Sequence, residues 1–428
     1  MALEDRVKPI RLAHVCLALM CFVAAPAAAF AQAGDQSLQQ EIERLRAEID
    51  TMRKQYEERL AALEARVASA SQPTEAPSAA TALAAPAVPP SDTSIAAQPV
   101  QGVPASSSKV FNPDMSVLGN FAGAAGENPM AEEPSLSLTE VEMAFQAVVD
   151  PYARADFFLS AGPEGLEVEE GYVTFTALPA GLLLKAGKMR EQFGKVNTMH
   201  THILPWVDRP LVLRNLFGGD EGVADAGMSL SKLIPNRFMF VDAIGEVYRG
   251  DSDVFHSEER SKLNYLGRIR AYRDLTEGTN LDIGTSYALG PSALVPDFNA
   301  QRIGFDATFR YRPLRRAIYR QFVGRTEVIW SRQDLPESGR QNTSGFYVSG
   351  DYQFARRWFL GARGDRSGRA DAADLRDAGG SIHLTFRPTE FSLVRGQYRR
   401  TQYAEGIDAN ELLFQINFAI GAHGAHPF

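Results

Sequence analysis

The strongest constraint on this chain is a strand-like segment near its end, residues 410–421, in which apolar and polar side chains alternate with a period of two. One face carries an unbroken apolar row, Leu412, Phe414, Ile416, Phe418 and Ile420, and the other face carries Glu411, Gln415 and Asn417. Successive side chains of a strand point to opposite faces, so this segment fits a strand with lipid on one side and water on the other. In other segments with the same alternation, we can therefore predict which face meets lipid and which meets water.

The same alternation recurs from Met115 onward and predicts an all-β fold. We expect about 16 strands, an even number typical of transmembrane antiparallel β-barrels. Their spans are 115–123, 136–149, 152–161, 167–178, 181–188, 225–233, 237–248, 262–273, 280–289, 301–312, 318–331, 343–355, 357–366, 377–387, 390–401 and 410–421. Short turns such as Asp150-Pro151 alternate with longer polar loops such as 249–261. Outer-membrane barrels have short periplasmic turns and long external loops. The same alternation of loop lengths here predicts that residues 109–428 form such a barrel.

The N-terminus favours export. Arg6, Lys8 and Arg11 precede an apolar run from Val15 to Phe30, and a small-residue cleavage site lies before Gln32. Residues 1–31 are therefore a predicted signal peptide. A membrane anchor is the weaker alternative, because the run is shorter than the roughly 20 residues that a spanning helix needs. The only two cysteines of the chain lie in this segment, so the mature chain has no thiol or disulfide chemistry.

Two further regions precede the barrel. In residues 37–67, apolar side chains alternate three and four apart (Leu38, Ile42, Leu45, Ile49, Met52), which predicts a short α-helical coiled coil. A single helix packed on the barrel is the alternative. Residues 68–108 are almost entirely Ala, Pro, Ser, Thr, Gln and Val, so we expect a disordered linker. The region before the barrel is thus predicted to be a coiled coil joined to it by a flexible linker.

The alternation also divides the charged side chains of the strands between lipid and lumen. A charge at the membrane midplane costs roughly 2–4 kcal/mol, so the charged face must turn inward. The pore-lining basic residues are then Arg154, Lys185, Arg268, Arg270, Arg310, Arg312, Arg325, Arg363 and Arg387, and the acidic ones include Glu140, Glu142 and Glu170. Carboxylates dominate the early strands and arginines the later ones, which predicts a transverse field and a weak anion preference. A polar lumen without selectivity remains the alternative.

A segment before the longest loop resembles a known family. In residues 182–194, a Gly187-Lys188 pair and a Phe193-Gly194 pair end a strand, as in the phosphate-selective porin group, and Phe428 after the last strand resembles the end signal of bacterial outer-membrane barrels. The resemblance implies a trimeric, anion-favouring diffusion channel. The lysine cluster and arginine ladder of that group have no residue-by-residue match here. The coil and linker resemble porins that reach toward the cell wall.

The longest connection, residues 189–224, is similar in position to the third external loop that narrows the lumen of general porins. We therefore expect a constriction loop with charged residues Arg190, Lys195, Asp208, Arg209, Arg214, Asp220 and Glu221. A surface or subunit-contact loop is the alternative. His200, His202 and Asp208 in this loop are a weak metal candidate, and we expect no metal or other cofactor.

The expected function is an outer-membrane porin, a passive channel for small hydrophilic solutes or anions, with its coiled coil in the periplasm. Ser381 and His383 share the lumen face, but barrel phospholipases display their nucleophile to lipid, so no catalysis is expected. The net charge of −8 argues against nucleic acid as a partner. The alternative is a non-conducting structural protein that tethers the outer membrane toward the cell wall through its coil.

Overall fold

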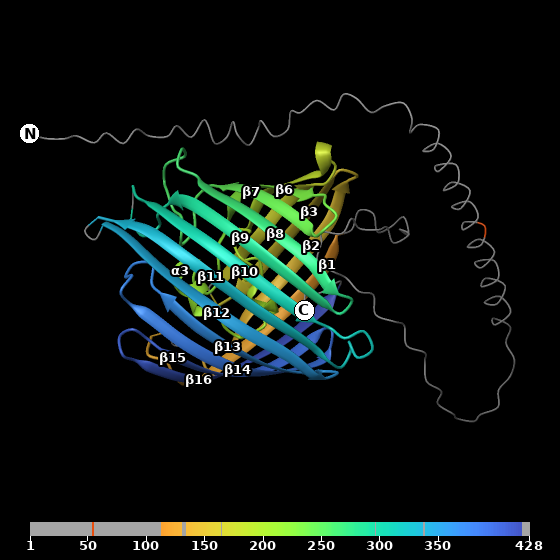
Figure 1. Cartoon of the computed structure of the whole chain (residues 1–428), viewed down its shortest axis with the longest axis vertical. Helices are drawn as coiled ribbons and strands as arrows, with labels where there is room; N and C mark the ends of the chain where they lie inside the picture. Colours follow the sequence, from red (N-terminus) through yellow and green to blue (C-terminus); the bar gives the residue numbers. More distant parts are fainter. Residues whose placement is uncertain are drawn as a thin grey trace, which may run out of the picture. The chain divides into compact units, whose positions relative to one another are not determined.

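The computed structural model describes Lys54 and residues 113–130, 134–163, 165–295, 297–336 and 339–421. Sixteen strands in this part of the chain form one closed antiparallel barrel, in which each strand pairs with its neighbours in sequence and β16 pairs with β1 (Figure 1). The bounds are β1 Asp114–Glu127, β2 Ser137–Asp150, β3 Ala153–Gly162, β4 Gly165–Phe175, β5 Leu182–Arg190, β6 Ala224–Ile234, β7 Phe240–Tyr248, β8 Asn264–Thr276, β9 Thr279–Pro291, β10 Asn299–Tyr311, β11 Gln321–Leu335, β12 Gly339–Ala355, β13 Trp358–Gly368, β14 Arg376–Thr389, β15 Ser392–Gln402 and β16 Asp408–Gly421. The predicted barrel and its strand number are confirmed.

The pleat separates the two faces as the alternation predicted. On β10, Ile303 and Phe305 are exposed on the outer face, whereas Arg302 and Asp306 are buried on the inner face. Large apolar side chains are exposed in the same way on strands around the barrel, while most of the buried charged side chains face inward. An apolar outside and a polar inside match a barrel that lipid surrounds. No described helix is long and apolar enough to cross a membrane.

Two connections differ from the prediction. The turn after β10 occupies residues 312–320, because backbone hydrogen bonds from Arg316 and Tyr319 close successive turns after Pro313, so that β11 begins only at Gln321. The β3–β4 connection is a tight turn, since Gly162 and Gly165 pair directly. The predicted signal peptide, coiled coil, linker and terminal Phe428 lie outside the described residues.

The β1–β2 pair and the β3–β4 pair each contain a β-bulge. The β1–β2 register passes from Asn120 opposite Glu140 to Phe121 opposite Leu138, so Thr139 is an extra residue. In the β3–β4 pair the register skips Glu169. A bulge turns side chains away from strict alternation and often lies beside functional sites. Glu169 and Glu170 therefore both reach the inner side of the wall, which the alternation rule did not predict.

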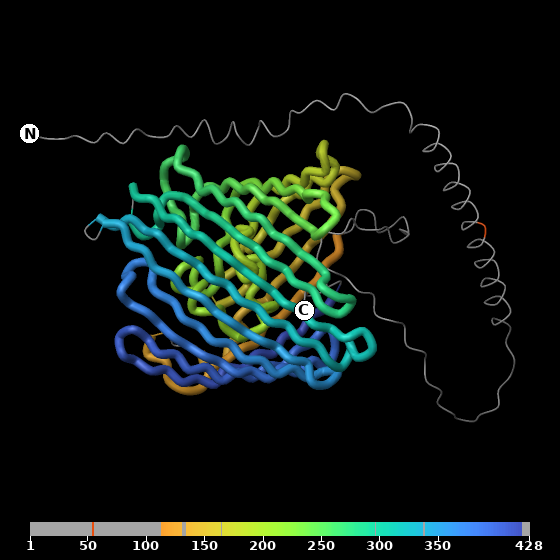
Figure 2. The backbone as a smooth tube through the Cα atoms, viewed as in Figure 1, coloured from red at the N-terminus to blue at the C-terminus, as the bar shows by residue number. Residues whose placement is uncertain are grey.

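The connection between β5 and β6 enters the barrel. It carries the short helix α3 (Leu211–Leu216), which contacts β11 to β14 on the opposite wall. The backbone trace shows the segment inside the ring of strands (Figure 2). The hydrophobic core of the described chain lies here, within the barrel.

Candidate pore constriction

The loop of residues 191–223, here called the lumen loop, is fixed to the wall by an apolar cluster. Its members Phe193, Trp206, Leu213 and Phe217 are at most 1% exposed, and they pack with Tyr347 of β12. The rings of Phe193 and Phe217 stack with 4.2 Å between centroids, and Trp206 meets Tyr347 edge-on at 5.2 Å. Each fully buried side chain of this size contributes about 1.5–3 kcal/mol. The length and position of the loop predicted that it enters the lumen, but not that these buried apolar side chains anchor it to the wall.

Arg209 holds the lumen loop together from within. Its side chain is buried and donates hydrogen bonds to the backbone carbonyls of Asp220 (2.7 Å), Glu221 (2.8 Å), Met199 (3.0 Å) and Val196 (3.4 Å). Burial lowers the pKa of the guanidinium to about 9. Since the side chain turns to the backbone of its own loop, Arg209 organises the loop and does not face a solute.

Asp208 ties the lumen loop to the far wall. Its carboxylate lies 2.7 Å from Arg363 Nη2 on β13 and 3.1 Å from Arg399 Nη1 on β15, and it also accepts a hydrogen bond from Gln397. Burial opposes ionisation, but the two guanidinium groups outweigh it and hold the pKa of Asp208 well below its usual range. The grouping of Asp208 with His200 and His202 was wrong, because these arginines are its partners.

The other predicted loop charges are also engaged. Lys195 Nζ lies 3.2 Å from Asp282 on β9, and burial lowers its pKa to about 8. Arg214 pairs with the exposed Asp220 at 2.6 Å. The Arg190 side chain donates to the Glu221 carbonyl at 2.6 Å. The charges of the loop therefore position it in the lumen.

Most predicted pore-lining arginines of the later strands are inward and paired with carboxylates. The pairs are Arg268–Asp306 (2.9 Å), Arg270–Asp282 (2.7 Å), Arg325–Asp351 (2.6 Å) and Arg363–Asp365 (2.7 Å). On the early strands Arg154 pairs with Asp156 at 2.7 Å, and Lys185 Nζ lies 4.5 Å from the Tyr172 ring centre. Arg310 is half-buried, and Arg312 lies exposed just beyond the end of β10.

Two neighbouring clefts remain between the lumen loop and the wall. Both are lined by Ile203 of the loop and by Arg387 and Arg395 of β14 and β15, and one of them also reaches Arg325. The other extends to Glu390 and Phe391 in the β14–β15 turn. We call them the basic clefts, since arginine dominates their charged lining.

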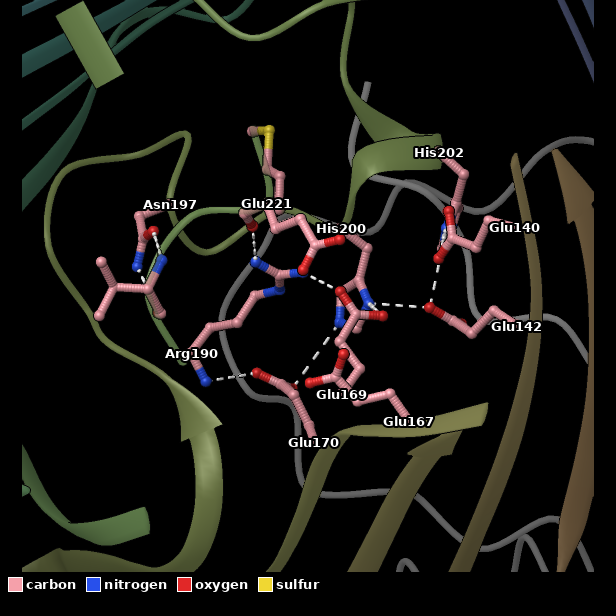
Figure 3. Close-up of polar contacts among 12 residues, drawn as sticks. Glu140, Glu142, Glu167, Glu169, Glu170, Arg190, Asn197, His200, His202 and Glu221 are labelled. Atoms are coloured by element: carbon pink, nitrogen blue, oxygen red, sulfur yellow. Dashed lines mark hydrogen bonds and ion pairs between the residues drawn. The ribbon is translucent and has the colours of Figure 1, made fainter. Parts of the chain in front are cut away.

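The opposite side of the loop meets a group of carboxylates that we call the acidic corner, made of Glu140 and Glu142 on β2 and Glu169 and Glu170 on β4 (Figure 3). His200 and His202 of the lumen loop lie among these side chains. His200 Nδ1 is 2.8 Å from Glu142 Oε2 and 3.0 Å from Glu169 Oε2. His202 Nδ1 is 3.5 Å from Glu140 Oε1 and 3.7 Å from Glu142 Oε2.

Arg190 balances part of the charge of the acidic corner. It pairs with Glu169, and its backbone N–H donates to Glu170 at 2.6 Å. Burial lowers the pKa of His200, but hydrogen bonds to Glu142 and Glu170 outweigh it, so that the net shift of this pKa is upward. The sequence predicted three of the carboxylates as lumenal, but not their meeting with the histidines.

His383 and Ser381 both face inward from β14, as predicted. His383 Nε2 lies 2.7 Å from Asp351 Oδ1 on β12. Asp351 is shared with Arg325, so His383 belongs to a charged network of the wall.

No family model matches the chain. An uncharacterized protein of Aquifex aeolicus is 28% identical over 387 aligned residues, which cover 75% of this chain and 81% of that protein. Three solved structures share the fold at 10% identity. They are the loop L8 deletion mutant of OmpT, an outer-membrane protein of Vibrio cholerae (TM-score 0.51, covering 72% of this chain and 99% of that one), OprB of Pseudomonas putida (0.51, 73% and 95%) and an anion-selective porin from Comamonas acidovorans (0.50, 72% and 100%). The chain thus has the barrel fold of outer-membrane porins that the resemblance implied.

Proposed function

We propose that the protein is an outer-membrane diffusion channel for small hydrophilic solutes. The observation that carries this proposal is a closed barrel with an apolar outer face, a charged inner face and a lumen loop that leaves arginine-lined clefts. Charged side chains with low-dielectric walls concentrate ions of opposite sign. Solutes pass beside the loop through the basic clefts. The predicted coiled coil, which precedes the barrel in the chain, lies in the periplasm.

A weak anion preference is part of this proposal. Arg387 and Arg395 line both clefts, and the Arg387 guanidinium lies 5.2 Å from the Phe359 ring centre. The carboxylates of the acidic corner face Arg190 and the histidines instead. A passing ion therefore meets more positive than negative charge in the clefts.

Single-channel conductance of the purified mature protein in planar bilayers tests the function, with a KCl gradient that gives the reversal potential. We expect stepwise conductance and a reversal potential of the sign for anion preference. Arg387→Glu should lower that preference, and Arg315→Glu, the same change in the exposed turn after β10, should leave it nearly unchanged. A folded, heat-modifiable barrel that never conducts would contradict the proposal.

The lumen loop also favours a second candidate, the non-conducting tether. Its apolar cluster is buried and packs against wall residues of β8 to β12, as a plug would. In that case the folded barrel with its intact loop shows no conductance in bilayers. A cell-wall contact of the coil would then be the function.

We further propose a homotrimer, as the resemblance implies. Conductance steps grouped in threes, together with the mass of the detergent-solubilised complex from light scattering, test this arrangement. A mass equal to one chain in detergent would contradict it.

A further inference from the structure

We propose that the acidic corner binds one divalent transition-metal ion of the Zn²⁺ type, with Glu140, Glu142 and His202 as its protein ligands. The three ligand atoms lie within 4.8 Å of one another, and two strand residues face one loop residue across the site. This proposal does not depend on whether the protein conducts.

The distances fit a metal better than a hydrogen bond. Two ligand atoms bound to one tetrahedral Zn²⁺ at about 2.1 Å lie about 3.4 Å apart. His202 Nδ1 lies 3.5 and 3.7 Å from the nearest oxygens of Glu140 and Glu142, longer than the 2.7–3.2 Å typical of N–H···O hydrogen bonds. A small cation placed between His202 Nδ1 and these two carboxylate oxygens could bind all three atoms.

Glu140 gives an independent indication. The residue is only 8% exposed, and its Oε2 forms no hydrogen bond with any residue that the structure describes. A buried carboxylate oxygen without a partner carries a large desolvation cost. A divalent ion at this position would offset that cost, and it would also offset the excess of four carboxylates over the single guanidinium of Arg190.

The site is built on fixed elements. The bulge at Thr139 lies next to Glu140, and the Thr139 hydroxyl donates to the Asn120 carbonyl at 2.9 Å. His202 lies in the 3₁₀ turn η3 (Thr201–Ile203), and its carbonyl accepts a hydrogen bond from Asn417 at 2.7 Å. Preformed ligand positions lower the entropy cost of binding.

His200 serves as a positioning residue. Its Nδ1 contacts Glu142 at 2.8 Å and Glu169 at 3.0 Å, and its ring lies against Phe158 with 5.1 Å between centroids. A group that holds a ligand carboxylate in place tunes the metal affinity. One imidazole and two carboxylates favour a first-row transition ion over Mg²⁺ or Ca²⁺, which prefer oxygen alone.

Calorimetric titration of the full-length mature protein, stripped with chelator and then given Zn²⁺ alone, tests the site. We expect one ion per chain, bound in the presence of excess Mg²⁺. His202→Ala should weaken binding about 100-fold, and His200→Gln about tenfold. His256→Ala, which removes a histidine from the exposed loop after β7, should change nothing.

Glu140→Gln keeps the shape of the side chain and guards against a variant that fails to fold. It should retain heat-modifiability and lose roughly 10–100-fold in Zn²⁺ affinity. Absence of Zn²⁺ binding by the wild type, or equal binding by wild type and His202→Ala, would overturn the proposal. A non-conducting protein that binds Zn²⁺ in this way would refute the channel and leave the metal site standing.

Discussion

At the scale of single residues, the charged side chains of the lumen loop act mainly on the protein itself. Arg209 bonds four backbone carbonyls, and Asp208 bonds two arginines of the far wall. A guanidinium offers a planar fork of donors that an ammonium group cannot replace. The contrast between buried Arg209 and the more exposed Arg214 can therefore be measured with one conservative change.

Arg209→Lys should loosen the lumen loop by about 2 kcal/mol, because buried carbonyls lose hydrogen bonds from a charged donor. Proteolytic cleavage within residues 191–223 of the folded barrel should accelerate roughly thirtyfold. Arg214→Lys is the matched control and should change the rate little, since its partner Asp220 is 63% exposed. Equal rates in the two variants would show that Arg209 does not organise the loop.

The sequence predicts the positions of some of these residues and not those of others. The inward positions of Arg268, Glu140 and Glu142 follow from alternation and were predicted. The position of Glu169 depends on a bulge, and a bulge adds one residue without a sequence signal that alternation can detect. The pairing of His202 with Glu140 joins residues far apart in the chain, so no local spacing could predict it.

At the scale of elements, the lumen loop resembles an internal domain core more than a surface loop. Its α3 helix buries Leu211, Val212, Leu213 and Leu216 against the wall. The barrel does not need the loop for its topology, because Arg190 at the end of β5 pairs directly with Ala224 at the start of β6. A tight turn can join two such strands.

Replacing residues 194–220 with a short Gly/Ser linker should therefore keep the barrel and open its lumen. We expect heat-modifiable folding and a severalfold larger conductance with weaker ion preference, because Asp208 and the apolar cluster no longer cross the lumen. Conductance of the wild-type size would mean that the loop does not narrow the path. Loss of the folded barrel would instead show that the apolar cluster supports the wall.

At the scale of the whole molecule, strand number and closure were accessible from the sequence because lipid and water impose opposite demands on the two faces of every strand. The segment of Leu412 to Ile420 predicted a wall strand, and it forms β16 beside β1. The filling of the lumen was less accessible, since the inward packing of Phe193 or Trp206 depends on contacts with distant strands. The alternation of apolar and polar side chains predicts the strands of the wall, but not the packing of the loop inside the barrel.

The seam between β1 and β16 closes the barrel and brings together the first and last strands. Two glycines of β1 lie under aromatic rings of β16 at this seam. A Cβ at Gly119 would lie 2.3 Å from the Phe418 ring, and a Cβ at Gly123 would lie 2.6 Å from the Phe414 ring and 2.1 Å from the Ser135 carbonyl oxygen. An aromatic ring covering a glycine of the neighbouring strand pins the register of the pair.

Gly123→Ala should destabilise the closed barrel by about 1–3 kcal/mol, because backbone at Ser135 must move to accept the methyl group. Gly119→Ala should cost less, since Phe418 is 51% exposed and its ring can turn outward toward lipid. Urea unfolding in lipid vesicles measures both free energies, and Phe418→Ala should remove the cost of Gly119→Ala. If the two glycine variants unfold at the same urea concentration, the backbone contact at Ser135 does not limit closure, and the rings alone set the register of the seam.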